Sequence, residues 1–308
     1  KIGANDRIAR LLGSIMGIHT IHNQSDCQST DSGGGEGKGN EYFLSYGRYL
    51  RVKYGEPTYR LGVDGGFNCP NRGRNRQTGG CSFCDEFGSQ AAYQRDWSDS
   101  ETLLAGRLDS VLRQIETGVE FLEKRYNAKS LILYYQAFSS TLGPVSELKK
   151  IYDSGLQARD FRELVVSTRP DCIDSASAAL LGGYVRDGFD VWVELGLQSA
   201  SNFTLRRIGR GHTVEQFDQA VQLLRGCGVK IAAHVIFGLP GEGEEQILNT
   251  VRHVAGLGID GIKIHDLHIP RNSRLLAEYL LGEISIPAPG RHLDYTIAAL
   301  ELLHPDTV

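Results

Sequence analysis

Six apolar runs of β type alternate with longer stretches of helical periodicity along most of this chain. We expect strands at Tyr59–Asp64, Ser130–Gln136, Leu164–Thr168, Val191–Gln198, Ile231–Phe237 and Gly261–Leu267. The helical stretches between them cover residues 101–125, 145–157, 175–187, 213–227 and 243–257. Strands that alternate with helices form parallel sheets with right-handed crossovers. The pattern therefore predicts an α/β fold, either a curled open barrel or a doubly wound sheet. In both, the chemistry should lie at the carboxyl ends of the strands.

Charge and hydropathy narrow the classes of function. The 308 residues include 33 Lys and Arg against 37 Asp and Glu, a net charge of −4. This balance excludes binding of nucleic acid through bulk charge alone. We expect no membrane partner, because the sequence contains no run of 18 apolar residues. Clustered cysteines in a long chain indicate a reducing compartment, so we expect a cytoplasmic protein.

The amino-terminal region differs in composition from the rest. The chain begins at Lys1 and holds one methionine, Met16, which we interpret as a sign of a fragment or a processed form. Residues 7–18 predict a short amphipathic helix, and residues 25–40 are a linker rich in glycine and serine. We therefore expect a flexible extension over residues 1–41, followed by one domain over residues 42–308.

A glycine-rich loop with three cysteines follows the first expected strand. Its spacing is Cys69-x11-Cys81-x2-Cys84 within residues 62–88. Thiolates are ligands of zinc and of iron–sulfur centres. A structural zinc site needs four protein ligands, and no histidine lies between residues 23 and 211. A cubane cluster held by three cysteines leaves one iron open to a small molecule. Zinc binding and unligated thiols remain the alternatives.

The same loop resembles the cluster loop of radical S-adenosylmethionine (SAM) enzymes. The segments GGFNCPNR and GGCSFC resemble more closely the YhcC/YtqA-like group, which is related to the catalytic subunit of the elongator complex. The x11 spacer departs from the usual Cys-x3-Cys-x2-Cys but fits this group. The resemblance runs from about Tyr42 to the chain end. The group carries more sequence after a segment like ALELLHPDTV, so we expect a truncated carboxyl terminus.

This resemblance implies a fold, two cofactors and a reaction. The fold would be a partial (β/α)6 radical SAM barrel. Cys69, Cys81 and Cys84 would hold a [4Fe-4S] cluster, and SAM would chelate its fourth iron. One electron, from a donor such as flavodoxin or ferredoxin, would cleave SAM into methionine and a 5′-deoxyadenosyl radical.

The resemblance also implies which residues contact SAM. The segment YYQAFSST lacks the family's glycine pair and acid but would still contact the methionine part. Related enzymes often carry a glutamate near the position of Ser167, and this chain has no acid there. Arg210 would pair with the SAM carboxylate, and His234 is either a ribose contact or a core histidine. The full predicted cofactor set is Phe83, Gln136, Ser139, Ser140, Ser167, Gln198, Arg210, His234 and Gly238.

Polar residues in the last expected strand indicate the substrate side. Ile262 and Ile264 alternate with Lys263 and His265, so the apolar pair should face the outer helices. Lys263 and His265 would then point into the barrel, where polar groups need a partner. We predict both as catalytic. A buried Glu194 would be a structural carboxylate or a proton acceptor.

A basic segment next to the cysteines suggests an RNA contact. Residues 48–76 contain seven Arg or Lys and two acids, a local charge of +5. Arg72, Arg74 and Arg76 lie inside the cysteine spacer and are predicted phosphate contacts. Neighbouring aromatic residues would stack on bases; they are Tyr42, Phe43, Tyr46, Tyr49, Tyr54 and Tyr59. The alternative is an amphipathic segment packed on the barrel edge.

The resemblance extends to the substrate. The YtqA-like branch is associated with the wobble uridine of transfer RNA, where 5-carboxymethylaminomethyluridine becomes 5-aminomethyluridine. We therefore predict a radical SAM enzyme that modifies transfer RNA. The alternatives are a radical SAM oxidoreductase acting on a small metabolite, and a zinc-binding interaction module.

Overall fold

The computed structural model describes residues 43–73, 79–84 and 103–308. The predicted helix at residues 7–18, the linker, the boundary at residues 41/42 and the residues Arg74 and Arg76 lie outside this part of the chain. Six strands form one sheet: β1 (Thr58–Val63), β2 (Ser130–Tyr135), β3 (Phe161–Thr168), β4 (Asp190–Gln198), β5 (Lys230–Phe237) and β6 (Gly261–Asp266). All five neighbouring pairs are parallel, in the order β1-β2-β3-β4-β5-β6.

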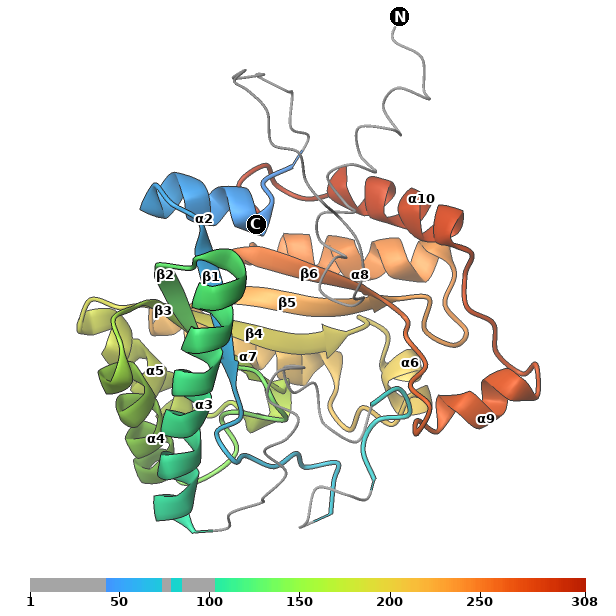
Figure 1. The fold of residues 1–308 in the computed structure, drawn as a ribbon. Coiled ribbons are helices and arrows are strands. Elements are labelled where there is room, and N and C mark those ends of the chain that lie inside the picture. Colours follow the sequence, from blue (N-terminus) through green and yellow to red (C-terminus); the bar gives the residue numbers. More distant parts are fainter. Residues whose placement is uncertain (1–42, 74–78, 85–102) are drawn as a thin grey trace, which may run out of the picture. The chain divides into compact units, whose positions relative to one another are not determined.

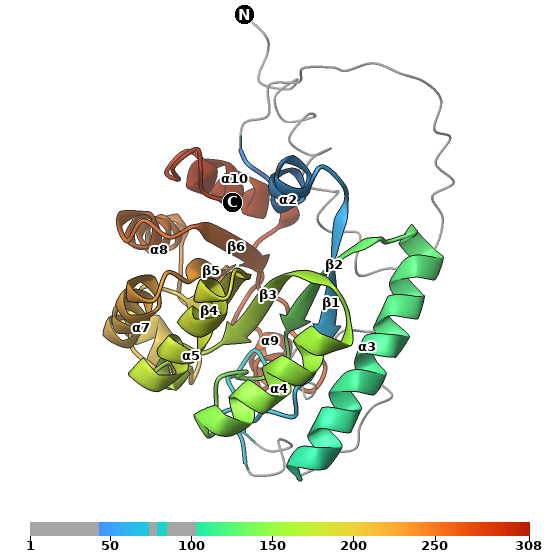
Figure 2. The same cartoon turned by 90° about the vertical axis from the view of Figure 1, so that its left-hand side faces the viewer.

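The sheet curls into a half-barrel with helices on its outside (Figures 1 and 2). The outer helices are α3 (Leu104–Tyr126), α4 (Val145–Ala158), α5 (Ser175–Arg186), α7 (Val214–Gly226) and α8 (Glu244–Gly256). The sequential strand order excludes the doubly wound alternative, in which the strand order reverses. The partial (β/α)6 barrel expected from the sequence is confirmed.

Alternate residues of each strand belong to different layers. Leu131, Leu133 and Tyr135 of β2 join the large core under the outer helices. Ile132 and Tyr134 instead join a separate cluster on the inner face. In β4 the inner positions run from Asp190 through Trp192 and Glu194 to Gly196, toward the carboxyl end. The inner face therefore changes from charged to aromatic and back to polar along one strand.

An additional helix, α2 (Tyr46–Tyr54), packs on this inner face near the start of β1 (Figure 2). The side chain of Ser45 caps its first turn, and Gly55 ends it with a left-handed φ of 73°. Leu50 packs against Ile132, Val165 and Trp192, with Tyr46, Tyr49 and Tyr54 around it.

The predicted role of these tyrosines as base-stacking residues is therefore wrong. The Tyr49 ring meets Trp192 edge-on, with centroids 5.8 Å apart. Tyr59 stacks on Tyr126 of α3, with centroids 5.5 Å apart. The alternative expected from the sequence, a segment packed on the barrel, is correct here. Trp192 and Tyr126 lie 143 and 67 residues from Tyr49 and Tyr59 in the sequence, so local composition did not reveal these contacts.

The remaining helices were not expected from the sequence. They are η2 (Pro170–Cys172), α6 (Asn202–Arg207), α9 (Leu275–Leu280) and α10 (Pro289–Leu300). After α10 the chain returns to β6, where the Val308 amide donates to the Asp260 carbonyl at 3.0 Å and the Val308 carbonyl accepts from Ile262 at 2.8 Å. In the described ranges, no helix combines the length and the apolar character needed to cross a membrane.

Candidate active site

The cysteine loop is held between α6 and α9 at the carboxyl ends of the strands (Figure 1). The Ser82 amide donates to the Ile208 carbonyl at 2.8 Å, and the Ser82 carbonyl accepts from Leu275 at 3.1 Å. Asn71 donates from its side chain to the carbonyls of Gly209 and Arg210, at 2.8 and 2.7 Å. The Ser82 backbone and the Asn71 side chain therefore hold the loop against segments more than 100 residues away in the sequence.

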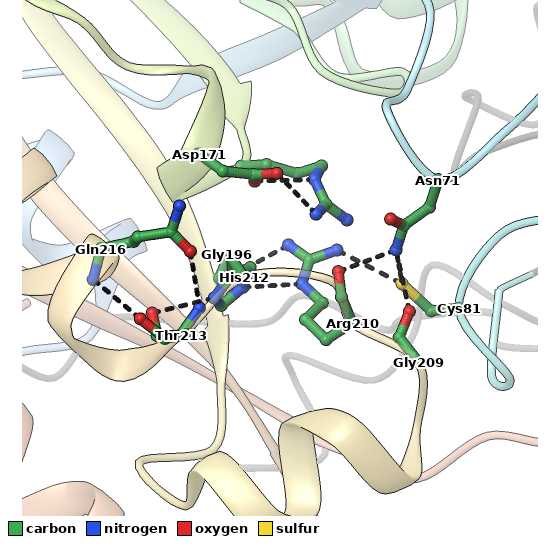
Figure 3. Close-up of polar contacts among 10 residues, drawn as sticks. Asn71, Cys81, Asp171, Gly196, Gly209, Arg210, His212, Thr213 and Gln216 are labelled. Carbon is green, nitrogen blue, oxygen red and sulfur yellow. Dashed lines mark hydrogen bonds and ion pairs between the residues drawn. The ribbon is translucent and has the colours of Figure 1, made fainter.

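Two of the three cysteine sulfurs have cationic or amide donors beside them. The buried Cys81 Sγ lies 3.4 Å from Asn71 Nδ2 and 3.6 Å from Arg210 Nη1 (Figure 3). Burial alone would raise the pKa of the Cys81 thiol, but Arg210, Arg169 and Asn71 outweigh it and lower that pKa. Arg72 Nη2 donates to Cys84 Sγ at 2.9 Å. The site therefore favours the thiolate, the form that binds metals.

The donor set fits an iron–sulfur cluster better than a single ion. Cys69, Cys81 and Cys84 are all free thiols. Within the described ranges, no three His, Cys, Asp or Glu side chains converge on one metal-ion position. A structural zinc ion needs such convergence, whereas a cubane binds each cysteine through a different iron. The three thiols therefore fit a cubane with one open iron, and they are one ligand short of a structural zinc site.

Arg210 is a buried cation beside the cysteines. Only 8% of its surface is exposed, and its Nη2 donates to the Gly196 carbonyl at 2.8 Å (Figure 3). Its Nε donates at 3.0 Å to Nε2 of His212. None of the described carboxylates forms an ion pair with Arg210. Its charged neighbour is the Cys81 sulfur at 3.6 Å, and a guanidinium without a carboxylate partner in the described ranges can also bind an anionic ligand.

Two neighbours make this position of Arg210 feasible. A Cβ atom on residue 196 would meet Arg210 Nη2 and the Gln198 amide, so a side chain there would displace both groups from their present positions. Burial and the nearby Arg210 lower the pKa of His212 to about 4. His212 is therefore neutral at pH 7, with Nδ1 donating to the Thr213 carbonyl at 3.2 Å and Nε2 free to accept from Arg210.

The predicted SAM contacts in β2 to β4 lie near one another at the strand ends. The amide of Gln136 donates to Val63 at 3.2 Å, that of Ser139 to Asn68 at 3.2 Å, and that of Ser140 to Ser167 at 3.1 Å. The Ser140 hydroxyl is used within the loop, where it donates to the Tyr135 carbonyl at 3.2 Å. Gln198 ends β4 with a left-handed φ of 75°, an uncommon conformation for a residue with a side chain.

Phe83 and Gly238 lie by the end of β5. Phe83 packs against the apolar cluster that contains Ile236 and Leu239. Gly238 has a φ of 84°, and a Cβ atom there would meet Pro287 at 2.9 Å. It lines a hollow of about 490 Å³, together with Pro240 and Glu242. The hollow is a surface feature beside the predicted adenine position.

The inner face of the barrel contains a polar group that we call the Glu194 cluster; its members are Arg60, Tyr134, Glu194, His234 and Lys263. Each comes from a different strand. Glu194 Oε2 accepts from Tyr134 at 2.6 Å, from His234 at 2.7 Å and from Lys263 at 3.4 Å. Glu194 Oε1 pairs with Arg60. His265 lies next to the cluster, with its ring centroid 5.4 Å from that of His234.

The environment shifts several pKa values in this cluster. Burial alone would raise the pKa of Glu194, but Arg60, Lys263 and His234 hold it well below its usual range. Burial lowers the pKa of Lys263, against the opposing effect of Glu194. Burial, with His234 and Lys263, lowers the pKa of His265 to about 3. Glu194 is therefore ionised and His265 is neutral at pH 7.

A second group of charges lies at the opposite end of the inner face. We call it the basal network; its members are Lys53, Tyr54, Glu163, Asp190 and Lys230. Lys53 Nζ lies 2.9 Å from Glu163 Oε1 and 2.6 Å from Asp190 Oδ2. Lys230 Nζ lies 3.0 Å from Asp190 Oδ1, and Tyr54 donates to Glu163 at 2.8 Å. The sequence prediction missed this network because α2 was not expected.

The two arginines with open roles have partners within the protein. Arg72 reaches Cys84, and its guanidinium lies over the Phe138 ring at 5.4 Å. Its role as an RNA contact remains a prediction. Arg169 forms a bidentate pair with Asp171, with both distances 2.9 Å. The Arg169 side chain is 3% exposed, so this pair is not a surface salt bridge.

Most of the chain is similar in sequence to known proteins. Residues 69–254 match the Radical SAM superfamily. The chain is 36% identical over 261 residues to Protein YhcC of Escherichia coli K12, which covers 84% of this chain and 78% of that protein. It is 30% identical over 260 residues to the uncharacterized protein YtqA of Bacillus subtilis, and the match covers 84% of this chain and 77% of that protein. A segment of 125 residues is 39% identical to a tRNA uridine(34) acetyltransferase of Methanocaldococcus infernus. This match covers 39% of this chain and 22% of that protein.

Solved structures share the fold. The archaeal Elp3 of Methanocaldococcus infernus superposes with a TM-score of 0.56 at 20% identity, covering 64% of this chain and 51% of that one. Coproporphyrinogen III oxidase (HemN) from Escherichia coli superposes with a TM-score of 0.53 at 16% identity, covering 82% and 54%. This chain therefore spans about half the length of each.

Proposed function

Because this chain belongs to the radical SAM superfamily, within its YhcC/YtqA-like group, we propose that it reductively cleaves SAM at a [4Fe-4S] cluster. When bound, these two cofactors supply a 5′-deoxyadenosyl radical, and the protein supplies orientation and exclusion of water. Cys69, Cys81 and Cys84 are the proposed cluster ligands. The observation that carries the proposal is the buried Arg210, which lies beside the Cys81 sulfur without a described carboxylate partner.

The proposed roles of the surrounding residues follow from their contacts. Arg210 binds the SAM carboxylate, because a planar guanidinium donates two parallel hydrogen bonds to a carboxylate. Neutral His212 fixes the guanidinium through its Nε. Gln198 faces the ribose, and Phe83 and Gly238 lie beside the adenine. Arg72 stabilises the Cys84 thiolate by a charge-assisted hydrogen bond.

Lys263 and His265 are the proposed catalytic residues on the substrate side. Both lie on the inner face of β6, and His265 is two positions nearer the carboxyl end. Glu194 holds Lys263 in place. No role is proposed for the basal network in the reaction, because a layer with Trp192, Ile132 and Val165 separates it from the site.

We propose transfer RNA as the substrate, with conversion of 5-carboxymethylaminomethyluridine to 5-aminomethyluridine at the wobble position. The support is the 39% identical segment shared with a tRNA uridine(34) acetyltransferase. The tyrosines of α2 do not support it, since they pack inside the barrel. A small-metabolite substrate is the second candidate, because the Glu194 cluster brings polar side chains from five strands together on the inner face. The proposed reductant is flavodoxin or ferredoxin, and the proposed location is the cytoplasm, where thiols stay reduced.

The first experiment measures SAM cleavage directly. The chain is reconstituted anaerobically with iron and sulfide, and 5′-deoxyadenosine is quantified after addition of dithionite and SAM. We expect cysteine-dependent product that is absent in Cys84→Ala. A well-formed cluster without product in the wild-type chain would contradict the proposed reaction.

The second experiment tests the RNA substrate. Binding of labelled transfer RNA is measured between about 50 and 200 mM salt, where phosphate contacts weaken binding steeply. We expect an affinity that falls with salt. Absent or salt-independent binding would favour the small-metabolite candidate.

A further inference from the structure

The Glu194 carboxylate has no remaining capacity for a ligand. Its two oxygens accept from four donors, on β1, β2, β5 and β6. Only 2% of its side chain is exposed. A carboxylate of this kind orients its partners and does not contact substrate itself.

The cluster around Glu194 has an excess of positive charge. Arg60 and Lys263 contribute two positive charges, and Glu194 contributes one negative charge. No other carboxylate in the described part of the chain pairs with either cation. His234 and His265 add no charge at pH 7, since burial lowers the pKa of both. The inner face thus has one positive charge that no described carboxylate balances, which favours the binding of an anion there.

The excess charge is accessible from the carboxyl end of the barrel. The Lys263 side chain is 38% exposed, although Glu194 beneath it is buried. His265 reaches solvent, although its ring lies against that of His234, and it is two residues closer to the cysteine loop on the same face of β6. An ammonium has three donors, and the one directed at Glu194 makes a long contact of 3.4 Å. Lys263 and His265 can therefore both donate to one bound group.

We propose that Lys263 and His265 bind a carboxylate of the substrate, and that Glu194 is the positioning residue for Lys263. One surplus charge matches a singly charged carboxylate better than a doubly charged phosphate. The ammonium and the neutral imidazole N–H supply one donor to each carboxylate oxygen. The assignment to a substrate rests on the proposed function. The carboxylate of SAM is the other source of the same chemistry, and the experiment separates the two.

The test follows the reactivity of Lys263 in the full chain. A short pulse of isotope-coded acetic anhydride labels the lysines, and peptide mass spectrometry reads each one. We expect propionate to slow acetylation of Lys263 about threefold when its concentration is twice its dissociation constant. Propionamide, which has the same shape without the charge, should have no effect. Lys230 is the internal control, because its ammonium already forms an ion pair with Asp190 at 3.0 Å.

Two variants and one additional arm make the result specific. His265→Leu should lose at least half of the protection by propionate, whereas His265→Asn, which retains an N–H donor, should keep it. The cluster-loaded chain is then saturated with SAM. Protection by propionate in the presence of SAM supports a substrate site, whereas full protection by SAM alone would assign the pocket to the cofactor and overturn the proposal.

Other outcomes would also overturn it. Equal protection by propionate and propionamide, or no protection by either, would exclude an anion site at Lys263. The labelling requires neither cluster nor SAM turnover, so it stands apart from the 5′-deoxyadenosine assay. Loss of SAM cleavage with intact propionate protection would contradict the proposed function alone.

Discussion

The same sheet carries two groups of buried charges on its inner face, and they differ in balance. In the basal network two lysines meet two carboxylates. In the Glu194 cluster two cations share one carboxylate. A layer with Trp192, Ile132 and Val165 separates the two groups. The exposed fractions of Lys230 and Lys263 are similar, 36% and 38%, so the two groups differ in charge balance and not in coverage. A balanced network stabilises the fold, whereas an unbalanced one leaves a positive charge that an anionic ligand can balance.

The largest expected effect comes from breaking the balanced network. Glu163→Ala removes the buried carboxylate that Lys53 and Tyr54 share, while Asp190 still pairs with Lys53, and should lower the free energy of unfolding by about 3 kcal/mol. Urea denaturation measures it. 5′-Deoxyadenosine formation per folded molecule should stay at the wild-type value, since Glu163 is remote from the cysteines. The double variant Lys53→Met with Glu163→Leu should recover most of the stability, because an apolar pair replaces the ions. A loss of SAM cleavage in the folded Glu163→Ala protein would show that the networks are coupled.

Acid should lower the stability of the protein through His212, which lies beside Arg210. Burial keeps the pKa of folded His212 at about 4, while an unfolded histidine titrates near 6.5. The unfolded chain therefore binds the proton first, so stability is present above pH 6.5 and is lost as pH falls toward 4. The loss should approach about 3 kcal/mol. Unfolding measured at several pH values should show a weaker dependence in His212→Asn. Identical curves for the two proteins would exclude His212 as the cause.

A methyl group beside Arg210 should have an intermediate effect. Gly196→Ala places a Cβ atom against Arg210 Nη2 and should cost about 1–3 kcal/mol through overpacking. It should also weaken SAM binding, measured by equilibrium dialysis on the cluster-loaded chain. Gly226→Ala is the matched control, because a Cβ there meets no atom within 4 Å. Equal SAM affinity in both variants would contradict the role proposed for Arg210.

The smallest effect should come from a charge pair outside the barrel. Arg207 on α6 pairs with Glu278 on α9, with side-chain exposures of 38% and 24%. Arg207→Ala should therefore change the free energy of unfolding by less than about 1 kcal/mol. Thermal unfolding measures it. A larger loss would mean that this pair, and not only the backbone contacts of Ser82, holds the cysteine loop.

The sequence predicted the sheet because strand periodicity is a local signal. Five strands begin within one residue of their expected positions, but β3 begins at Phe161 instead of Leu164. Glu163 interrupts the apolar run, and only the partners Lys53 and Tyr54 explain a charge there. The alternation in β6 also suggested the inward direction of Lys263, which contacts Glu194.

The position of α2, the partners of Glu194 and the packing of the cysteine loop could not be predicted, because they depend on residues far apart in the sequence. The basic and aromatic composition around α2 is equally typical of an RNA-binding surface and of a buried plug. Arg60 and Tyr134 carried no local sign that they meet Glu194, which is 134 and 60 residues away. The Cys-x2-Cys spacing indicated a metal loop, but the packing of that loop between α6 and α9 required the fold.

Alternate inner positions of β4 set a fixed distance along the strand between the Glu194 cluster and Arg210. Glu194 belongs to the substrate side and Gly196 lies under Arg210, so one step of about 6.6 Å along the backbone separates the two layers. The spacing is set by the main chain and does not depend on the side chains that surround Glu194. Such a strand would let evolution exchange the cluster residues for a new substrate without moving the cofactor layer. A single inserted residue would instead turn the inner set outward and disconnect both layers at once.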